Sequence, residues 1–244
     1  MSLRGRGVLV TRPAGVAAPL AERIARAGGR AILFPAIEIA ALPRPAAFDR
    51  LSDFALAIFV SPTAVERALA MIGPWPRTVA VAAVGEGTRR ALESAGVAGV
   101  LAPSEGADSE SLLALPELAR FSGRHLLIVR GAGGRELLVQ SLAARGCEVE
   151  VAECYRRLPP AADPGALLAD WAAGKVHAVT VFSRESLDNL AALVGEARLR
   201  TTPLFVSHPR IAEHAARHGI AAIVAGPGDD AMVERLVAYF HERD

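Results

Sequence analysis

The sequence predicts an α/β protein with two similar domains, each a doubly wound, flavodoxin-like parallel sheet. Three observations favour this fold class. Short apolar runs alternate with amphipathic runs, and strands that alternate with helices form parallel sheets with right-handed crossovers. The first half of the chain resembles the second half. The 244 residues are 52% hydrophobic, which is enough chain to bury more than one core.

Six strand–turn–helix units follow one another along the chain. In each unit an apolar run indicates a strand buried on both faces, and the next helix ends at or near a glycine that suits a C-cap. The expected strands are 8–10, 55–60, 79–84, 126–129, 178–182 and 203–206. The fourth helix is expected to run from Arg135 to Gly146.

An internal repeat supports two domains. A shift of 118 positions places VLVTRPAGVAAPLAERIARAG over LLIVRGAGGRELLVQSLAARG, and seven of these 21 positions are identical, Arg12 and Arg130 among them. A shift of about 122 positions pairs IFVSPTAVERAL with TVFSRESLDNL. The chain therefore divides into two similar halves of about four strand–helix units each, and two such sheets predict a cleft between two domains.

Charge and composition exclude several classes of protein. The 27 basic and 26 acidic residues lack the basic excess of a nucleic-acid binder. No stretch reaches the roughly 18 apolar residues of a membrane span. Cys147 and Cys154 lie seven apart and form neither a redox motif nor a disulfide framework. We expect a monomeric, cytoplasmic protein without nucleic-acid or membrane partners.

Nucleotide-binding motifs fail at defined positions. The motif that begins at Gly131 has Glu136 where a dinucleotide fingerprint needs its third glycine, and the motif that begins at Gly85 has Arg90 there. A Walker-type loop needs a lysine after its last glycine, and the only lysine, Lys175, lies elsewhere. The sequence predicts no cofactor.

A metal site is also not expected. His214 and His218 lie four apart on an expected helix, but the HAARH motif lacks the glutamate of a zinc protease and the sequence shows no third ligand. An exposed helix face explains these histidines more simply.

The turns after the strands are the candidate binding positions. Ligands of open parallel sheets bind beyond the carboxyl ends of the strands, and each turn here also opens a helix whose unpaired N–H groups favour anions. Their hydroxyls either cap the helices or touch a ligand. These hydroxyl residues are Thr11, Ser61, Thr63, Thr88, Ser183 and Ser186.

Over nearly its whole length the chain resembles the uroporphyrinogen-III synthase family. The order and spacing of seven blocks together carry the resemblance. They are VLVTRP (8–13), LFPAIEI (33–39), IFVSPTAVERAL (58–69), VAAVGEGTRRALESAG (81–96), LLIVRGAGGRELLVQSLAARGCEVEVAECYRR (126–157), VTVFSRESLDNL (179–190) and LFVSHPRIAEHAARHGI (204–220).

The resemblance implies a particular domain layout and activity. One domain would combine residues 1–36 with 159–244, residues 46–146 would form the other, and 37–45 and 147–158 would be extended connectors. The implied reaction of this hydro-lyase is closure of hydroxymethylbilane, with loss of water and inversion of ring D, in tetrapyrrole and haem biosynthesis. The substrate carries eight carboxylates, which suits arginines and helix N-termini. The implied catalytic task is to hold one folded conformation, without cofactor or metal.

The resemblance also implies site residues. Tyr155 in CYRR matches the family's tyrosine facing the cleft and is the catalytic candidate, although a half-buried structural tyrosine is the alternative. Substrate-binding candidates are Arg12, Ser61, Thr63, Gly85, Gly87, Thr88, Gly131, Arg135, Ser183, Ser186, His208 and Arg210. The sequence departs from the family where His208 and Ile211 replace a usual glycine and threonine.

Two other functions remain open at this point. A non-catalytic relative that binds tetrapyrroles or other anions as a regulator is favoured by His208 and Ile211, whereas Tyr155, Gly85 and Thr88 favour the enzyme. A flavodoxin-like oxidoreductase that binds a nucleotide is the third possibility.

Overall fold

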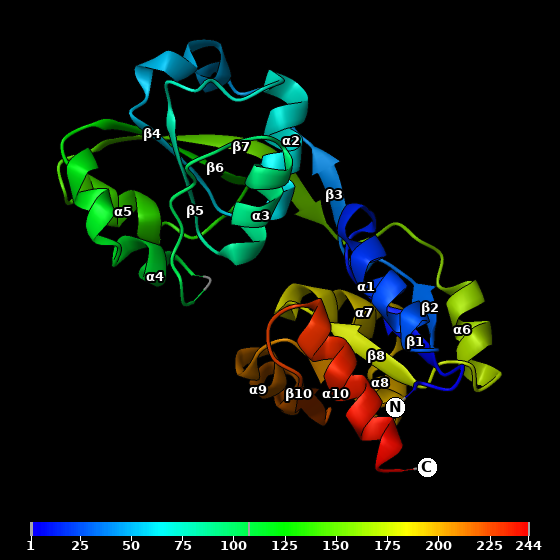
Figure 1. Ribbon diagram of the computed structural model, residues 1–244. Coiled ribbons are helices and arrows are strands. Elements are labelled where there is room, and N and C mark those ends of the chain that lie inside the picture. The colour runs from blue at the N-terminus through cyan, green and yellow to red at the C-terminus, as the bar shows by residue number, and fades with distance from the viewer. Residues whose placement is uncertain (1, 107, 244) are drawn as a thin grey trace. The chain divides into compact units, whose positions relative to one another are not determined.

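The computed structural model describes residues 2–106 and 108–243, and these divide into two compact units. Unit 1 comprises 1–38 with 158–244, and unit 2 comprises 39–157. Each unit contains one five-stranded sheet (Figure 1). The α/β fold class predicted from the sequence is confirmed. Among the described residues, no helix is long and apolar enough to cross a membrane.

The sheet of unit 1 is parallel and has the order β10-β9-β8-β1-β2. Counted along unit 1 alone this is the flavodoxin order 2-1-3-4-5, in which the direction of winding reverses between β1 and β8. Val8 of β1 pairs with Ala31 on one side and with Ala178 on the other. The strands are β1 (Gly7–Val10), β2 (Arg30–Leu33), β8 (Ala178–Val181), β9 (Leu204–Val206) and β10 (Ala222–Val224).

Helices cover both faces of this sheet because its central strands are apolar on both sides. Val8 and Val10 pack with α1 (Ala14–Arg26) and α10 (Asp229–His241), whereas Leu9 belongs to the core on the opposite face. Helices α1 and α10 lie side by side in Figure 1. The remaining helices are α6 (Gly165–Ala172), α7 (Arg184–Val194), α8 (Glu196–Thr201) and α9 (Pro209–Arg217).

The sheet of unit 2 has the order β3-β7-β6-β4-β5. Strand β4 lies between β5 and β6, and it pairs in parallel with both. A parallel bridge between Ala82 and Leu101 continues the sheet beyond β5. The strands are β3 (Glu38–Ala41), β4 (Leu56–Phe59), β5 (Ala80–Ala83), β6 (His125–Gly131) and β7 (Glu148–Leu158), so the segments expected as extended connectors contain two neighbouring strands of this sheet.

Two cores also enclose the sheet of unit 2. Alternate residues of β4 point to opposite faces: Phe59 packs with α2 and α3, and Ile58 packs with α4 and α5. The helices are α2 (Pro62–Ile72), α3 (Glu86–Ser94), α4 (Ser109–Leu113) and α5 (Leu137–Ala143), with 3₁₀ helices over Ala46–Asp53 and Pro116–Phe121.

The fourth helix differs from its prediction. Helix α5 begins at Leu137 instead of Arg135 and has only seven residues. The reason is a turn before it: Gly133 has a φ of 73°, and the Arg130 guanidinium donates hydrogen bonds to the carbonyls of Gly134 and Arg135. Those two residues therefore belong to a loop held by a side chain.

Two threonines join the central strands of unit 1 where the winding reverses. Thr180 is fully buried, and its hydroxyl donates to the Leu9 carbonyl at 2.9 Å. In return, the hydroxyl of Thr11 donates to the Thr180 carbonyl at 2.8 Å. The candidate hydroxyl of Thr11 therefore serves the sheet itself.

We expect Thr180→Val to lower the free energy of unfolding by about 1–2 kcal/mol, because it removes a buried hydrogen bond without changing side-chain volume much. Urea denaturation followed by circular dichroism measures the change. The matched control is Thr201→Val at the exposed last residue of α8, for which a change within about 0.5 kcal/mol is expected. Equal effects of the two substitutions would contradict a stabilising role for the Thr180 hydrogen bond.

Candidate functional site

In unit 2 three predicted site residues meet at the ends of β4, β6 and β7. Ser61 follows β4 and caps α2, since its Oγ accepts from the Ala64 N–H at 3.1 Å. The same Oγ lies 3.1 Å from the hydroxyl of Tyr155. The Tyr155 ring lies against Gly131, where an added Cβ would be 2.6 Å from the ring Cζ. Only glycine allows this approach.

Tyr155 is almost fully buried, whereas the structural alternative expected from the sequence was a half-buried tyrosine. Its side chain is 2% exposed and its ring belongs to the core beneath α2 and α3. A buried tyrosine hydroxyl needs a hydrogen-bond partner, and Ser61 supplies it. The tyrosine is thus one hydrogen bond away from the N-terminus of a helix.

The neighbouring Cys154 does not provide a second reactive group. Its side chain is fully buried, and burial raises the pKa of the thiol to about 12. The nucleophilic form of cysteine is the thiolate, so this thiol is inert near neutral pH.

The turn after β5 lies beside the start of α2. Gly85 precedes α3 in an extended conformation, and Gly87 lies close enough to α2 that an added Cβ would touch Pro62 at 3.8 Å. Thr88 is buried and its N–H bonds to the Gly85 carbonyl. Thr63 is half-buried in the first turn of α2. These turn residues therefore share one edge of unit 2.

A carboxylate already occupies the first turn of α3. Glu86 accepts hydrogen bonds from Arg89 at 2.7 Å and from Arg90 at 2.6 Å. Hydrogen bonds from these two arginines, Arg89 first, lower the pKa of Glu86 to about 2. Glu86 is thus ionised throughout the physiological range, and a substrate carboxylate here would bind beside a neutralised ion-pair cluster.

A cavity of about 250 Å³ opens at the carboxyl ends of β4, β5 and β6. The cationic groups that line it are Arg130 and Arg135. Arg135 is 61% exposed and pairs with Glu110 at 2.7 Å, which raises the pKa of Arg135. The cavity is lined by Val60, Val84, Asp108, Ser109, Ile128, Arg130, Gly134, Arg135 and Leu138.

Arg130 is a functional candidate that its sequence motif alone does not single out. Its side chain is 10% exposed, and it pairs with Glu136 at 2.8 Å and with Glu153 at 3.3 Å. The internal repeat that aligns it with Arg12 was the available signal. Arg130 holds the glycine loop in place and is not free to leave it.

In unit 1, Arg12 extends from the end of β1. Its guanidinium pairs with Asp229 at the start of α10 at 2.7 Å and lies 3.8 Å from the ring centroid of Phe182. Burial lowers the pKa of Arg12, and Asp229 opposes that effect. An arginine so enclosed is first of all a structural group at this edge.

The other candidates of unit 1 cap helices. Ser183 accepts from the N–H of Ser186 at 3.1 Å, and their hydroxyls lie 2.8 Å apart. His208 begins α9 and its Nδ1 accepts from the N–H of Arg210, which is exposed. Ile211 packs into the core of unit 1. The departures from the family pattern thus have local explanations, a histidine cap and an apolar core residue.

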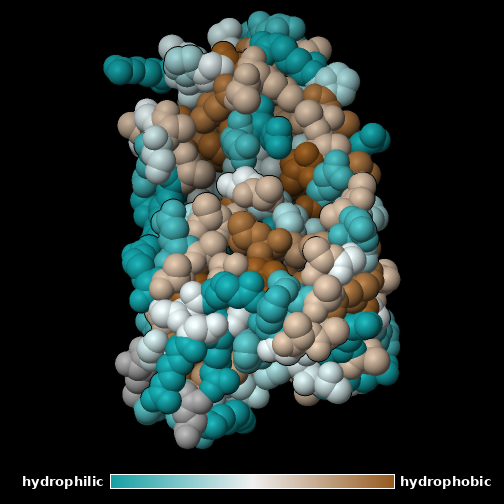
Figure 2. Space-filling view, turned by 90° about the vertical axis from the view of Figure 1, so that its right-hand side faces the viewer, coloured by the Kyte–Doolittle hydropathy of each residue, from teal (hydrophilic) through white to brown (hydrophobic). Residues whose placement is uncertain are grey.

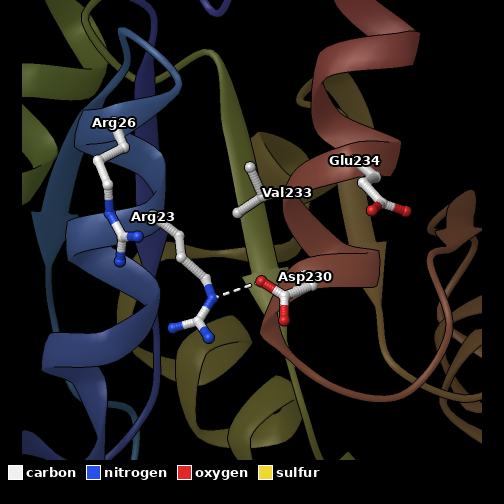
Figure 3. Close-up of a pocket in the computed structure, with 5 residues that line it drawn as sticks. All are labelled: Arg23, Arg26, Asp230, Val233 and Glu234. Atoms are coloured by element: carbon white, nitrogen blue, oxygen red, sulfur yellow. Dashed lines mark hydrogen bonds and ion pairs between the residues drawn. The ribbon is translucent and has the colours of Figure 1, made fainter.

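A second cavity, of about 150 Å³, lies on the outside of unit 1 between α1 and α10 (Figure 3). Arg23 extends from α1 toward Asp230 of α10, and the two side chains pair at 2.6 Å. The hydrogen bond to Asp230 raises the pKa of Arg23. None of the predicted site residues lines this cavity.

We expect Gly131→Ala to lower the free energy of unfolding by about 1–3 kcal/mol, because the new methyl group displaces the Tyr155 ring. The matched control is Gly87→Ala, where the added methyl makes an ordinary contact and replaces a helical glycine. Chemical denaturation measures both. A Gly131→Ala variant as stable as the Gly87→Ala variant would show that the ring has room to move.

A family model described as "Uroporphyrinogen-III synthase HemD" matches residues 18–234. The uroporphyrinogen-III synthase of Escherichia coli is 36% identical over 195 residues, which cover 77% of this chain and 79% of that protein. The synthase of Synechococcus elongatus is 28% identical over 202 residues, or 79% of this chain and 76% of that protein.

Solved structures share the fold. The uroporphyrinogen-III synthetase of Helicobacter pylori has a TM-score of 0.65 at 14% identity, covering 96% of this chain and 99% of that chain. A mutant synthase from the extreme thermophile Thermus thermophilus has a TM-score of 0.61 at 20% identity, covering 98% and 100%. The resemblance found in the sequence is confirmed: the chain belongs to the uroporphyrinogen-III synthase family.

Proposed function

We propose that this protein is an active uroporphyrinogen-III synthase, which closes hydroxymethylbilane with loss of water and inversion of ring D. The observation that carries the proposal is the family match across residues 18–234. The contact of Ser61, Gly131 and Tyr155 at one strand edge supports an enzyme over a binding relative. It would act as a monomer in the cytoplasm, and the near balance of 27 basic and 26 acidic residues weighs against a nucleic-acid partner.

The Ser61–Tyr155 pair offers a route for a proton to the leaving hydroxyl. A serine hydroxyl has one donor and two acceptor sites. If the Tyr155 hydroxyl donates to Ser61 Oγ, both acceptor sites are filled, since the Ala64 N–H takes the other. The Ser61 proton then points at the substrate and can pass to the leaving hydroxyl while Ser61 takes the proton of Tyr155. This general acid assistance lowers the barrier to loss of water, and the proton that the substrate releases on ring closure would return to Tyr155 through Ser61.

The carboxylates of the substrate would bind at the helix N-termini and arginines of the strand edges. Exposed ion pairs contribute about 0–1 kcal/mol, so Arg135 can exchange Glu110 for a substrate carboxylate at little cost. Arg12 is less available, because its side chain and that of Asp229 are both mostly buried. The proposed binding set is Arg12, Ser61, Thr63, Gly85, Gly87, Thr88, Gly131, Arg135, Ser183, Ser186, His208 and Arg210.

The function is tested by product analysis. The purified protein is mixed with freshly generated hydroxymethylbilane, the products are oxidised, and the uroporphyrin isomers are separated. We expect predominantly type III, because the protein holds the chain in the conformation that inverts ring D. Predominantly type I, as in the reaction without protein, would contradict the proposal and favour the non-catalytic relative.

We expect Tyr155→Phe to lower kcat several-fold with little change in KM, because the ring still packs while the proton route loses its first donor. The share of type I product should rise as uncatalysed closure competes. Ser61→Ala is expected to cause a decrease of similar size, and Arg135→Ala a smaller one. The matched control is Tyr239→Phe in unit 1, the only other tyrosine. An unchanged kcat in the Tyr155→Phe variant would exclude Tyr155 from the proton route.

A further inference from the structure

We propose that Asp188, His214 and His218 form a binding site for a divalent transition-metal ion of the zinc type on unit 1. One potential ligand atom from each residue lies within 4.8 Å of the others. The sequence displays only the two histidines, because Asp188 lies 26 positions before His214. The missing third ligand of the HAARH motif is therefore supplied by another helix.

The packing of α7 against α9 creates the cluster. His214 is in α9, and His218 is the C-cap residue that follows that helix. Residues four apart lie on the same face of a helix, and here the two imidazole centroids are 5.2 Å apart. Asp188 is in α7, whose apolar side shares a core with α9. The core thus places the carboxylate opposite the two imidazoles.

The hydrogen bonds around the cluster orient its ligands. The Asp188 carboxylate lies 2.6 Å from Nε2 of His214. Nδ1 of His218 lies 3.0 Å from a carboxylate oxygen of Glu196, which directs the proton to Nδ1 and leaves Nε2 as the ligand nitrogen. Arg200 in turn bonds to Glu196 and donates from its Nε to the His218 carbonyl at 3.1 Å. Histidine ligands in proteins commonly have such an outer shell.

Two imidazoles and one carboxylate form a common ligand set for Zn²⁺, with a fourth position left for water. Ligand atoms around tetrahedral zinc lie roughly 3.4 Å apart, given bonds of about 2.1 Å. The spacing of up to 4.8 Å therefore closes with small side-chain rotations, and the contact between His214 and Asp188 opens to admit the ion. Side-chain exposures of 50% for Asp188 and 39% for His218 allow entry from solvent.

The position of the cluster assigns it a structural role. His208 marks the start of α9, and His214 and His218 follow six and ten residues later, about 9 and 15 Å along the helix at 1.5 Å per residue. The candidate substrate-binding turn of this helix is at its start. A bound ion would thus join α7 to the far part of α9 and stabilise unit 1 without entering the ring closure.

The untagged, chelator-treated protein is titrated with Co²⁺ as a spectroscopic probe, followed by displacement with Zn²⁺. We expect one ion per chain, visible bands typical of four-coordinate Co²⁺, and a higher thermal midpoint with Zn²⁺. Asp188→Asn, His214→Ala and His218→Ala should each weaken binding by at least about tenfold, and Glu196→Gln by about tenfold. The matched control is the exposed His241→Ala, at the end of α10.

Two results would overturn the site. The first is wild-type protein that binds no more Co²⁺ than a variant lacking both His214 and His218, which would reduce the cluster to two surface hydrogen bonds. The second is an Asp188→Asn variant that binds Co²⁺ as tightly as the wild type, which would show that Asp188 is not a ligand. Circular dichroism of each variant confirms that the fold is retained, and unaltered binding in His241→Ala excludes a general effect of histidine loss.

Discussion

Both sheets depend on burying the two faces of short central strands. Val8 and Val10 of β1 face one core while Leu9 faces the other, and Ile58 and Phe59 divide β4 in the same way. Strands so apolar must be covered by helices on both sides, and parallel pairing requires every crossover helix to begin at the same edge of its sheet. Caps and turn residues therefore collect at the carboxyl edge of each unit. Figure 2 shows one face of the molecule, on which hydrophilic and hydrophobic residues are interspersed.

Much of this arrangement could be predicted from the sequence. The six apolar runs are strands, and Ser61 and Ser183 cap helices as the turn chemistry predicts. The short edge strands β2 and β10 were not among the predicted strands, although each lies in an apolar run, AILF (31–34) and IAAIVA (220–225). The late start of α5 was missed since it depends on the Arg130 side chain. Likewise, the nearness of Asp188 to His214 results from helix packing that periodicity does not encode.

The two arginines that the repeat aligns have diverged in use. Arg12 pairs with a carboxylate distant in sequence and lies over an aromatic ring, so it connects the start of α10 to the end of β1. Arg130 bonds mainly to its own loop, and it sets the shape of the cavity wall beside it. One repeat position thus supports tertiary contacts in one unit and loop geometry in the other. The two halves therefore place an arginine at the same position of the strand edge, but the arginine makes different contacts in each unit.

The pairing of β1 has a consequence for synthesis of the chain. Its two neighbours are β2, which follows shortly, and β8, where Val8 meets Ala178. All of unit 2 is encoded between them in one continuous segment, 39–157. During translation unit 2 can complete its core as soon as β7 has emerged, whereas β1, α1 and β2 must wait for the C-terminal third. The N-terminal segment is therefore the part of the nascent chain with the longest exposure to chaperones and proteases on the ribosome.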